Sequence, residues 1–281
     1  MNNLTNYHSH TSFCDGKAPM EAFIAEAVRQ GFTSYGVSSH APLPFRTRWT
    51  IDDREQTGLY LQEFARLKRL YGDRIELYVG LEIDYMDEDQ QPANDYFQSL
   101  PLDYRIGSVH LLHSMQGEIV DIDTRPEVFR EHVRLHLGGD PKRVVLAYFD
   151  KLMRMIGRGG FDFIGHADKI SYNVSCCEPD ILGQQWYKDK ISEYFTFIAE
   201  KGAMIEVNTK TLHRNGFLYP NKEHFGLIRT LGIPVVVNSD AHLPELINSG
   251  RPEALRLLKA SGIGAVWQLE RGVWTEVPIG E

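Results

Sequence analysis

The sequence predicts an α/β fold in which parallel strands alternate with helices and close into a barrel. Short β-rich runs alternate with amphipathic helical patterns along the 281 residues, and no long linker or internal repeat separates them. Such repeated units indicate a parallel sheet covered by helices. Seven or eight units in a chain of this length suit a closed barrel better than an open sheet. We therefore expect residues 1–281 to form a single barrel domain.

Eight segments have the composition of strands. They are Leu4–His8, Ser34–Ser38, Glu76–Ile83, Tyr104–Leu112, Phe161–Gly165, Ala203–Asn208, Pro234–Asn238 and Ile263–Trp267. The alternation fails in two places, Asp87–Pro101 and Ser114–Asp140, where we expect insertions or lids.

Three of the intervening helices have clear sequence signals. The first opens at Pro19, which suits the first turn, and continues with apolar residues at helical spacing over Met20–Val28. The second begins at Asp140–Pro141, an N-cap followed by the first helical residue. The third has an apolar stripe over Ile191–Ile198 and ends near Gly202.

Composition limits the class of protein. With 42% apolar and 24% charged residues, the chain can bury a core and is not expected to be disordered. It begins without the basic and apolar runs of a signal peptide, and it lacks the roughly 18 consecutive apolar residues of a membrane span. Cys14, Cys176 and Cys177 fit neither a disulfide framework nor a C-x-x-C zinc site, so we expect reduced thiols. We expect a cytoplasmic protein with no membrane partner, and the sequence leaves the oligomeric state open.

Histidine and carboxylate side chains recur where the predicted strands end. His8 and His10 follow the first strand as H-S-H, and residues two apart in an extended segment project to the same side. The C-terminal ends of barrel strands converge on one face, where active sites lie. The other candidates at or just beyond strand ends are Asp15, His40, Glu82, His110, His166, Asp240 and His242. We therefore expect a metal site, and imidazole with carboxylate ligands suits Zn, Fe or Mn.

Simpler roles stay open for some of these residues. Glu82 could be an exposed carboxylate, although its apolar neighbours in the sequence make an unpartnered charge costly. His166 could form a plain buried hydrogen bond with Asp168, and His242 with Asp240. These alternatives predict ordinary packing in place of a ligand cluster.

Other polar residues have less specific signals. His113 could donate a proton to a leaving alcohol or could simply be exposed in a loop. His132 and His136 are four residues apart, but without an H-E-x-x-H pattern a solvated helix face is favoured. Arg105 and Lys169 are equally well explained as structural ion-pair partners.

The order of the candidate ligands resembles the PHP (polymerase and histidinol phosphatase) family. The matching elements are H-S-H at His8 and His10 with Asp15 after it, His40, G-L-E ending at Glu82, S-V-H ending at His110, G-H-A-D from Gly165 to Asp168 and S-D-A-H from Ser239 to His242. They run in the family's order and span nearly the entire chain. Asp15 departs from the histidine that many members have there, and an oxygen ligand is compatible with the same metals.

The resemblance implies a distorted (βα)7 barrel, TIM-like and of PHP type, with two or three divalent ions (Zn, Fe or Mn) at the C-terminal ends of the strands. It implies a first ion on His8, His10, Glu82 and Asp240, a second on Glu82, His110 and His166, and a third on Asp15, His40 and His242. Glu82 would then bridge two ions. The implied chemistry is phosphoester hydrolysis by attack of a metal-bridging hydroxide on phosphorus, with Glu82 and Asp240 in the catalytic centre.

Flanking sequences are similar to those of the histidinol-phosphatase branch. They are G-L-E-I-D-Y from Gly80, L-D-Y-R-I-G-S-V-H from Leu102, I-E-V-N-T from Ile205 and the pair Tyr219–Pro220. The resemblance implies hydrolysis of L-histidinol phosphate to L-histidinol and phosphate, a step of histidine biosynthesis.

The phosphate-binding basic residues implied by the resemblance should lie near I-E-V-N-T, where this chain has Lys210, His213 and Arg214. Arg214 is our preferred choice, also as a catalytic residue, because its fork suits phosphate oxygens.

Two other functions stay open. One is a PHP phosphoesterase that acts on nucleotides or nucleic-acid ends, and the other is a catalytically inert PHP module. The net charge of −8 does not favour a nucleic-acid partner, so a small phosphate ester is the expected substrate. The complete ligand set argues against the inert module. The sequence also has neither a P-loop nor a G-x-S-x-G motif.

Overall fold

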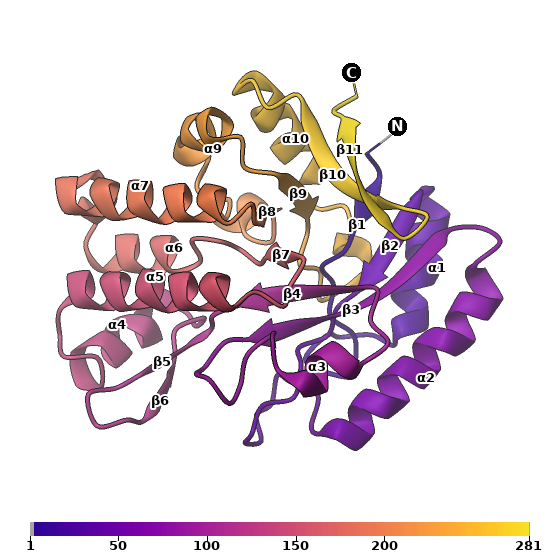
Figure 1. Cartoon of the computed structure of the whole chain (residues 1–281), viewed down its shortest axis with the longest axis horizontal. Coiled ribbons are helices and arrows are strands. Elements are labelled where there is room, and N and C mark those ends of the chain that lie inside the picture. Colours follow the sequence, from indigo (N-terminus) through magenta and orange to yellow (C-terminus); the bar gives the residue numbers. More distant parts are fainter. Residues whose placement is uncertain (1–2, 281) are drawn as a thin grey trace.

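Seven parallel strands form one sheet in the order β1-β2-β3-β4-β7-β8-β9, with helices outside it, in a computed structural model that describes residues 3–280 (Figure 1). The strands of this sheet are β1 Thr5–Asn6, β2 Ser34–Val37, β3 Glu76–Asp84, β4 Tyr104–Ser108, β7 Phe163–Ile164, β8 Met204–Asn208 and β9 Val235–Asn238. The helices are α1 Met20–Gln30, α2 Arg54–Tyr71, α3 Asp95–Ser99, α4 Pro126–Leu135, α5 Pro141–Arg158, α6 Ile170–Cys177, α7 Gln185–Glu200, α8 Leu212–Asn215, α9 Phe225–Leu231 and α10 Arg251–Ala260.

The first and last strands of the sheet approach each other and nearly close the barrel. The backbone N–H of Tyr7 donates to Asn238 Oδ1 at 2.8 Å, and Ser9 and Ala241 form a parallel bridge just beyond the strands. The His10 N–H donates to the Ala241 carbonyl at 2.8 Å. The predicted seven-stranded barrel is confirmed, and its closure joins the H-S-H and S-D-A-H segments backbone to backbone.

The prediction of an eighth barrel strand at Ile263–Trp267 is wrong. This segment overlaps β10 (Ala265–Glu270), which pairs antiparallel with β11 (Val273–Pro278) in a separate hairpin. Arg271 and Gly272, with φ of 51° and 77°, form its turn, and positive φ at both central residues is typical of a two-residue hairpin loop. Residues 263–267 therefore have the composition of a strand, but the strand that they overlap pairs in a hairpin outside the barrel sheet.

The predicted strand Tyr104–Leu112 is two strands. β4 ends at Ser108, and β5 (Leu111–His113) leaves the barrel to pair with β6 (Ile119–Asp121). Of the two irregular regions, Asp87–Pro101 contains α3, and Ser114–Asp140 contains β6 and α4. Both are insertions between barrel elements, as predicted.

Helix starts follow the predicted signals. α1 begins directly after Pro19. At the start of α5, Asp140 accepts a hydrogen bond from the Lys142 N–H at 2.9 Å, so it is the N-cap. α7 ends at Glu200, just before Gly202.

An aromatic layer fills part of the barrel interior. Tyr7, which is fully buried, packs edge-on against Trp274 of the β10–β11 hairpin with ring centroids 5.3 Å apart. The Tyr104 hydroxyl donates to the Tyr7 carbonyl at 2.6 Å. A Cβ at Gly36 or Gly80 would clash with the Tyr104 ring, so both glycines are required by this packing. The layer gives the ligand-bearing strands a rigid base.

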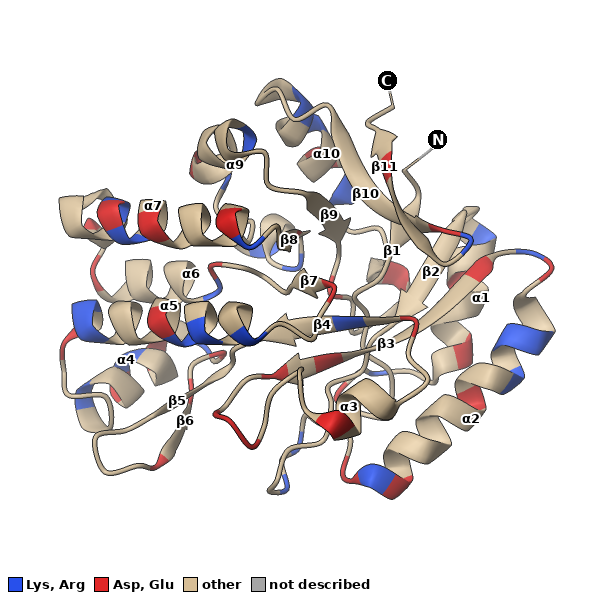
Figure 2. Ribbon diagram, in the orientation of Figure 1, with Lys and Arg blue, Asp and Glu red and all other residues tan. Residues whose placement is uncertain are grey.

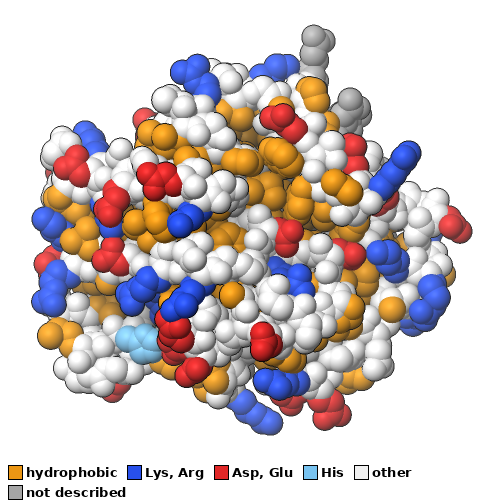
Figure 3. All heavy atoms as spheres, viewed as in Figure 1, with side chains coloured by type: hydrophobic (Ala, Val, Ile, Leu, Met, Phe, Trp, Pro, Cys, Tyr) orange, Lys and Arg blue, Asp and Glu red, His pale blue; other side chains and the backbone are white. Residues whose placement is uncertain are grey.

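Figure 2 shows Lys and Arg along α5 and α2 among acidic residues, and Figure 3 shows both signs of charge interspersed with apolar side chains on the same face. Among residues 3–280, none of the helices combines the length and apolar character needed to span a bilayer.

Candidate metal centre

Glu82, at the C-terminal end of β3, is the centre of the histidine cluster. It is only 1% exposed. Its Oε2 lies 3.1 Å from His8 Nε2, 3.4 Å from His10 Nε2 and 3.0 Å from His40 Nδ1. One carboxylate oxygen therefore faces three imidazoles from the segments that follow β1 and β2.

The other oxygen of Glu82 faces a second group of residues. Oε1 lies 2.8 Å from His166 Nε2 and 3.4 Å from His110 Nε2. These two ring nitrogens lie 3.1 Å from each other, and Ser108 Oγ donates to Oε1 at 2.7 Å. Because its two oxygens point to different imidazole groups, Glu82 has the geometry of a carboxylate that bridges two cations.

Asp240, which follows β9 at the other end of the sheet order, completes the first group. Its Oδ1 lies 3.1 Å from His10 Nε2 and 3.9 Å from His8 Nε2. Lys210 Nζ donates to the same oxygen at 3.1 Å. The closure between β1 and β9 therefore brings Asp240 beside the H-S-H histidines.

Asp15 and His242 lie at the outer side of the cluster. Asp15 Oδ2 lies 3.2 Å from His242 Nε2, and Oδ1 lies 3.9 Å from His10 Nδ1 and 4.0 Å from His40 Nε2. The alternative of a plain His242–Asp240 pair is weaker, since His242 Nδ1 lies 3.5 Å from Asp240 Oδ1.

The donor set fits metal ions. Within the described residues, three sets have ligand atoms within 4.8 Å of one another: His10, Asp15, His40 and His242; His8, His10 and Glu82; and His40, Glu82 and His110. Two ligands about 2.1 Å from one cation lie roughly 3.0–3.4 Å apart, which is the spacing of many pairs here. Three of these ligand atoms are buried without a hydrogen-bond partner, as atoms that bind a cation would be. They are His10 Nε2, His40 Nδ1 and Asp15 Oδ1.

Glu206 of β8 is a buried carboxylate that sequence reasoning missed, and it contacts two of the candidate ligands, His8 and His166. It is fully buried, and its Oε1 lies 2.7 Å from His8 Nδ1. Its Oε2 accepts from the His166 backbone N–H at 2.8 Å, and the Asn208 and Asn238 amides donate to its two oxygens. Because His8 Nδ1 is held by Glu206, Nε2 is the ring atom that faces Glu82, which is the orientation of a metal-ligating histidine.

Asp84 holds the Nδ1 atom of His110, as Glu206 holds that of His8. Both of its oxygens lie 3.0 Å from His110 Nδ1, and Oδ1 also accepts from the His110 N–H at 2.8 Å. The signal was present in G-L-E-I-D-Y, because Asp84 lies two residues after Glu82 on the same side of the strand.

The backbone is strained at two of the candidate ligands. Outside glycine, positive φ occurs in residues 3–280 only at His166 (29°), Asp240 (48°) and Arg271 in the hairpin turn. Such conformations cost of order 1–3 kcal/mol and persist where the surroundings enforce them, often at functional sites.

The charges of the carboxylates suit cation binding. Burial alone would raise the pKa of Glu82 and Asp240, but basic neighbours outweigh burial and hold both pKa values well below their usual range. Those neighbours are His8, His40 and His110 for Glu82, and Lys210 and His8 for Asp240. Both groups are ionised at neutral pH, as metal ligands must be.

The imidazoles divide into two kinds. Burial lowers the pKa of His10 well below its usual range and that of His40 to about 4, so both rings are neutral. Burial also disfavours charge on His110, but Asp84 and Glu82 outweigh it and raise the pKa of His110 to about 10.

A cavity of about 140 Å³ opens onto the cluster. Its lining residues are Asp15, His40, Trp49, His110, Asp121, Asp123, Lys210 and His242. Of the basic residues predicted for phosphate, Lys210 lines this cavity, whereas His213 and Arg214 on α8 are exposed and do not. The reason is that the chain turns into α8 directly after Lys210 and carries both side chains away.

Other predicted roles are resolved by contacts. Lys169 pairs with Asp123 at 3.1 Å, in line with an ion-pair role, and Arg105 donates to backbone carbonyls, including that of Phe97. Asp168 accepts from Ser171 and Asn221 rather than from His166, and burial raises its pKa to about 7.

His132 Nδ1 lies 2.8 Å from the Asp121 carbonyl, and His136 Nδ1 lies 3.3 Å from Glu118 Oε2, so neither belongs to the cluster. His113 is exposed and lines a different cavity.

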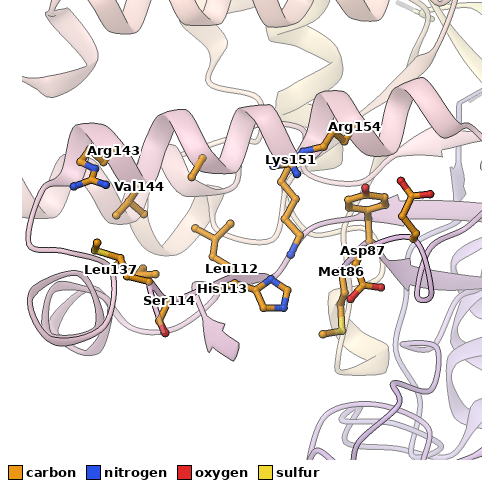
Figure 4. A pocket seen from close by; sticks show the side chains of 14 residues that line it. Met86, Asp87, Leu112, His113, Ser114, Leu137, Arg143, Val144, Lys151 and Arg154 are labelled. Carbon is orange, nitrogen blue, oxygen red and sulfur yellow. The ribbon is translucent and has the colours of Figure 1, made fainter. Parts of the chain in front are cut away.

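That second cavity, of about 480 Å³, lies beside α5 and contains none of the candidate ligands (Figure 4). Lys151 and Arg154 project into it from the helix, and His113 and Asp87 face them. The cluster at the strand ends therefore has its own, smaller and more polar cavity.

Comparison with known proteins gives one family. The family model described as "PHP domain" matches residues 6–210. A Schizosaccharomyces pombe protein named "Probable histidinol-phosphatase" is 27% identical over 281 residues, covering 94% of this chain and 89% of that protein. A Bacillus subtilis protein named "Histidinol-phosphatase" is 25% identical over 251 residues, covering 84% of this chain and 92% of that protein.

Two solved structures share the fold. A Listeria monocytogenes structure described as "putative histidinol phosphatase hisK" superposes with a TM-score of 0.76 at 23% identity, and the match covers 89% of this chain and 99% of that chain. A histidinol phosphate phosphatase from Lactococcus lactis, solved with zinc, L-histidinol and phosphate, has a TM-score of 0.70 at 17% identity, with coverages of 97% and 99%.

Proposed function

Because the chain belongs to the PHP domain family, we propose that it is a metal-dependent phosphatase that hydrolyses L-histidinol phosphate to L-histidinol and phosphate. The curated relatives named histidinol-phosphatase match over most of their own length, and the related Lactococcus enzyme binds zinc, histidinol and phosphate. The observation that carries the proposal is the position of Glu82, whose two oxygens face separate groups of imidazoles.

The proposed metal ligands follow the strand ends. A first ion would be held by His8, His10, Glu82 and Asp240, a second by Glu82, His110 and His166, and a third by Asp15, His40 and His242. Mixed imidazole and carboxylate ligands suit Zn, Fe or Mn. When bound, two or three such ions supply positive charge for the phosphoryl oxygens and activate a water nucleophile.

The protein side chains fix the orientation of these ligands. Glu206 and Asp84 hold the Nδ1 atoms of His8 and His110, so that each Nε2 faces Glu82 and would ligate an ion on losing its proton. Lys210 adds a positive charge at the cavity wall, where it can donate to a phosphate oxygen.

The test is phosphate release from L-histidinol phosphate beside nucleotide and sugar phosphates, after chelation and re-addition of Zn, Mn or Fe. We expect metal-dependent release with a preference for histidinol phosphate, lost in His110→Ala and Asp240→Ala. His136→Ala, at a half-buried position outside the cluster, is the matched control and should keep the wild-type rate. Equal or faster release from nucleotides would contradict the substrate, and release that does not depend on metal would contradict the mechanism.

A further inference from the structure

The cavity of about 480 Å³ beside α5 shares no lining residue with the cavity at the metal centre. Three basic residues of α5 line it, namely Arg143, Lys151 and Arg154 (Figure 4). They lie on one side of the helix, because spacings of eight and eleven residues return to nearly the same side at 3.6 residues per turn. Ala147 lies on that side between Arg143 and Lys151, and its methyl group occupies little of the space there.

Lys151 is the buried member of the three and is only 5% exposed. Its Nζ donates to the Leu111 carbonyl at 2.8 Å, which uses one of the three donors of an ammonium group. Within residues 3–280, no carboxylate forms an ion pair with it. Burial lowers the pKa of Lys151 to about 8, so the group still carries its charge at neutral pH. A buried charge with two free donors and no counter-ion is costly, and an anion in the cavity would remove that cost.

The acidic residues of the cavity are already engaged. Asp87 Oδ1 accepts two backbone N–H groups of its own turn, at 2.9 and 3.1 Å, and Glu88 pairs with Arg158. Arg143 and Arg154 are exposed, and neither forms an ion pair in the part of the chain that the structure describes. The cavity wall therefore carries an excess of positive charge.

The remainder of the wall is largely apolar. Leu112, Leu137 and Val144 are buried and face the cavity, and Met115 lines it while 69% exposed (Figure 4). A volume of several hundred Å³ with apolar walls and a few convergent charged groups is typical of a small-molecule site.

We propose that this cavity is a second ligand-binding site, for a small molecule in which one carboxylate is attached to an apolar body. The carboxylate lies between Lys151 and Arg154, which are three residues apart and therefore neighbours on the helix surface. One negative charge suits the site better than two, because Asp87 faces these basic groups (Figure 4). The apolar body extends along α5 toward Leu137 and Val144, which is about 10 Å from Lys151 at 1.5 Å per residue. Two fused rings, or a chain of similar length, fill that distance.

This inference is independent of the proposed function, because the cavity contains none of the candidate metal ligands. The test is isothermal titration calorimetry at neutral pH with 2-naphthoate and with the neutral alcohol of the same shape, 2-naphthalenemethanol. The proteins are zinc-loaded wild type, Lys151→Met, Arg154→Gln and Lys142→Met. Lys142 is the matched control because it is an exposed lysine of α5 that does not line the cavity. Arg154→Gln changes an exposed side chain, so it tests the site even if the buried substitution disturbs the fold.

We expect saturable binding of 2-naphthoate to the wild type and to Lys142→Met with equal affinity. Lys151→Met should weaken it about tenfold or more, the effect of losing a charge-assisted hydrogen bond. Arg154→Gln should weaken it about two- to fivefold, as for an exposed ion pair. The alcohol should bind at least about tenfold more weakly than 2-naphthoate to the wild type and should not respond to Lys151→Met.

Three results would overturn the site. They are the absence of saturable 2-naphthoate binding, equal affinity in wild type, Lys151→Met and Arg154→Gln, and loss of binding on chelation of zinc. The last result would place the carboxylate on the metal ions rather than beside α5.

Discussion

Glu206 shows that the cluster depends on residues that do not touch the cavity. It accepts hydrogen bonds from a ring, a backbone N–H and two amides, so it fixes His8 and the strained His166 together. Glu206→Gln keeps the size of the side chain, but it replaces one accepting oxygen with an NH2 group that faces groups that are themselves hydrogen-bond donors. We expect metal affinity and activity to fall about 10–100-fold with the fold retained, as for other partners of metal ligands. Metal titration with circular dichroism as a fold check would measure this, and wild-type affinity would show that Glu206 is only a packing residue.

The candidate ligands could be predicted at the residue scale because each follows a predicted strand and carries a metal-binding side chain. Glu206 is flanked by apolar residues in the same way as Glu82, so the cost of burying its charge was an available signal. Asp121 could not be assigned to the cavity, because its place there depends on how an irregular insertion folds back over the barrel. Arg214 was predicted to lie at the cavity but is exposed on α8. The local sequence does not determine the direction in which this short helix leaves the strand.

At the scale of elements, β3 carries Glu82 and packs Gly80 against Tyr104. Gly80→Ala should therefore destabilise the protein by about 1–3 kcal/mol through overpacking. Gly58→Ala, at a helical position of α2 with no atom within 4 Å of the new Cβ, should instead stabilise it by about 0.5–1 kcal/mol. Urea unfolding gives the free energy of unfolding of both variants. Equal changes in this free energy for Gly80→Ala and Gly58→Ala would contradict the close packing of β3 on Tyr104.

Helix α5 buries Lys151, whose Nζ donates to the Leu111 carbonyl at 2.8 Å. Burial lowers its pKa from 10.5 to about 8. Between these values the unfolded chain binds the proton and the folded protein does not, so Lys151 makes stability rise with pH across the window from about 8 to 10.5.

Lys151→Met should remove this rise in the free energy of unfolding, which is on the order of 3 kcal/mol over the whole window. Unfolding measured from pH 7 to 10 is the test, with the exposed Lys142→Met on the same helix as control. An unchanged pH profile would show that Lys151 stays protonated in the folded protein.

Element identity was predictable where hydrophobic period and caps agree, as at α1 and α5. Pairing partners were not, because strand composition does not distinguish a parallel barrel strand from a hairpin strand. That is why Ile263–Trp267 was assigned to the barrel and β5 was joined to β4.

At the scale of the whole molecule, the site lies where the barrel closes, so metal binding and folding should be coupled. The H-S-H segment and Asp240 come from opposite ends of the chain and meet through the Ser9–Ala241 bridge. Ions that hold both would stabilise the closed barrel by about 2.7 kcal/mol at a free concentration 100 times Kd. Chelation should lower Tm and re-addition of zinc should restore it, and a Tm independent of metal would contradict this coupling.

We also propose that residues 1–281 unfold as one unit, because the first and last barrel strands depend on each other. Two separate unfolding transitions would contradict it.

The most direct test of the metal centre is anomalous diffraction at the zinc edge from crystals of the zinc-loaded protein. The proposal predicts at least two peaks, one on each side of Glu82, about 2.0–2.2 Å from its oxygens and from the facing histidine nitrogens. Well-ordered crystals with no peak at Glu82, and with its oxygens still 3 Å from His40 and in direct hydrogen bonds to the histidines, would contradict it.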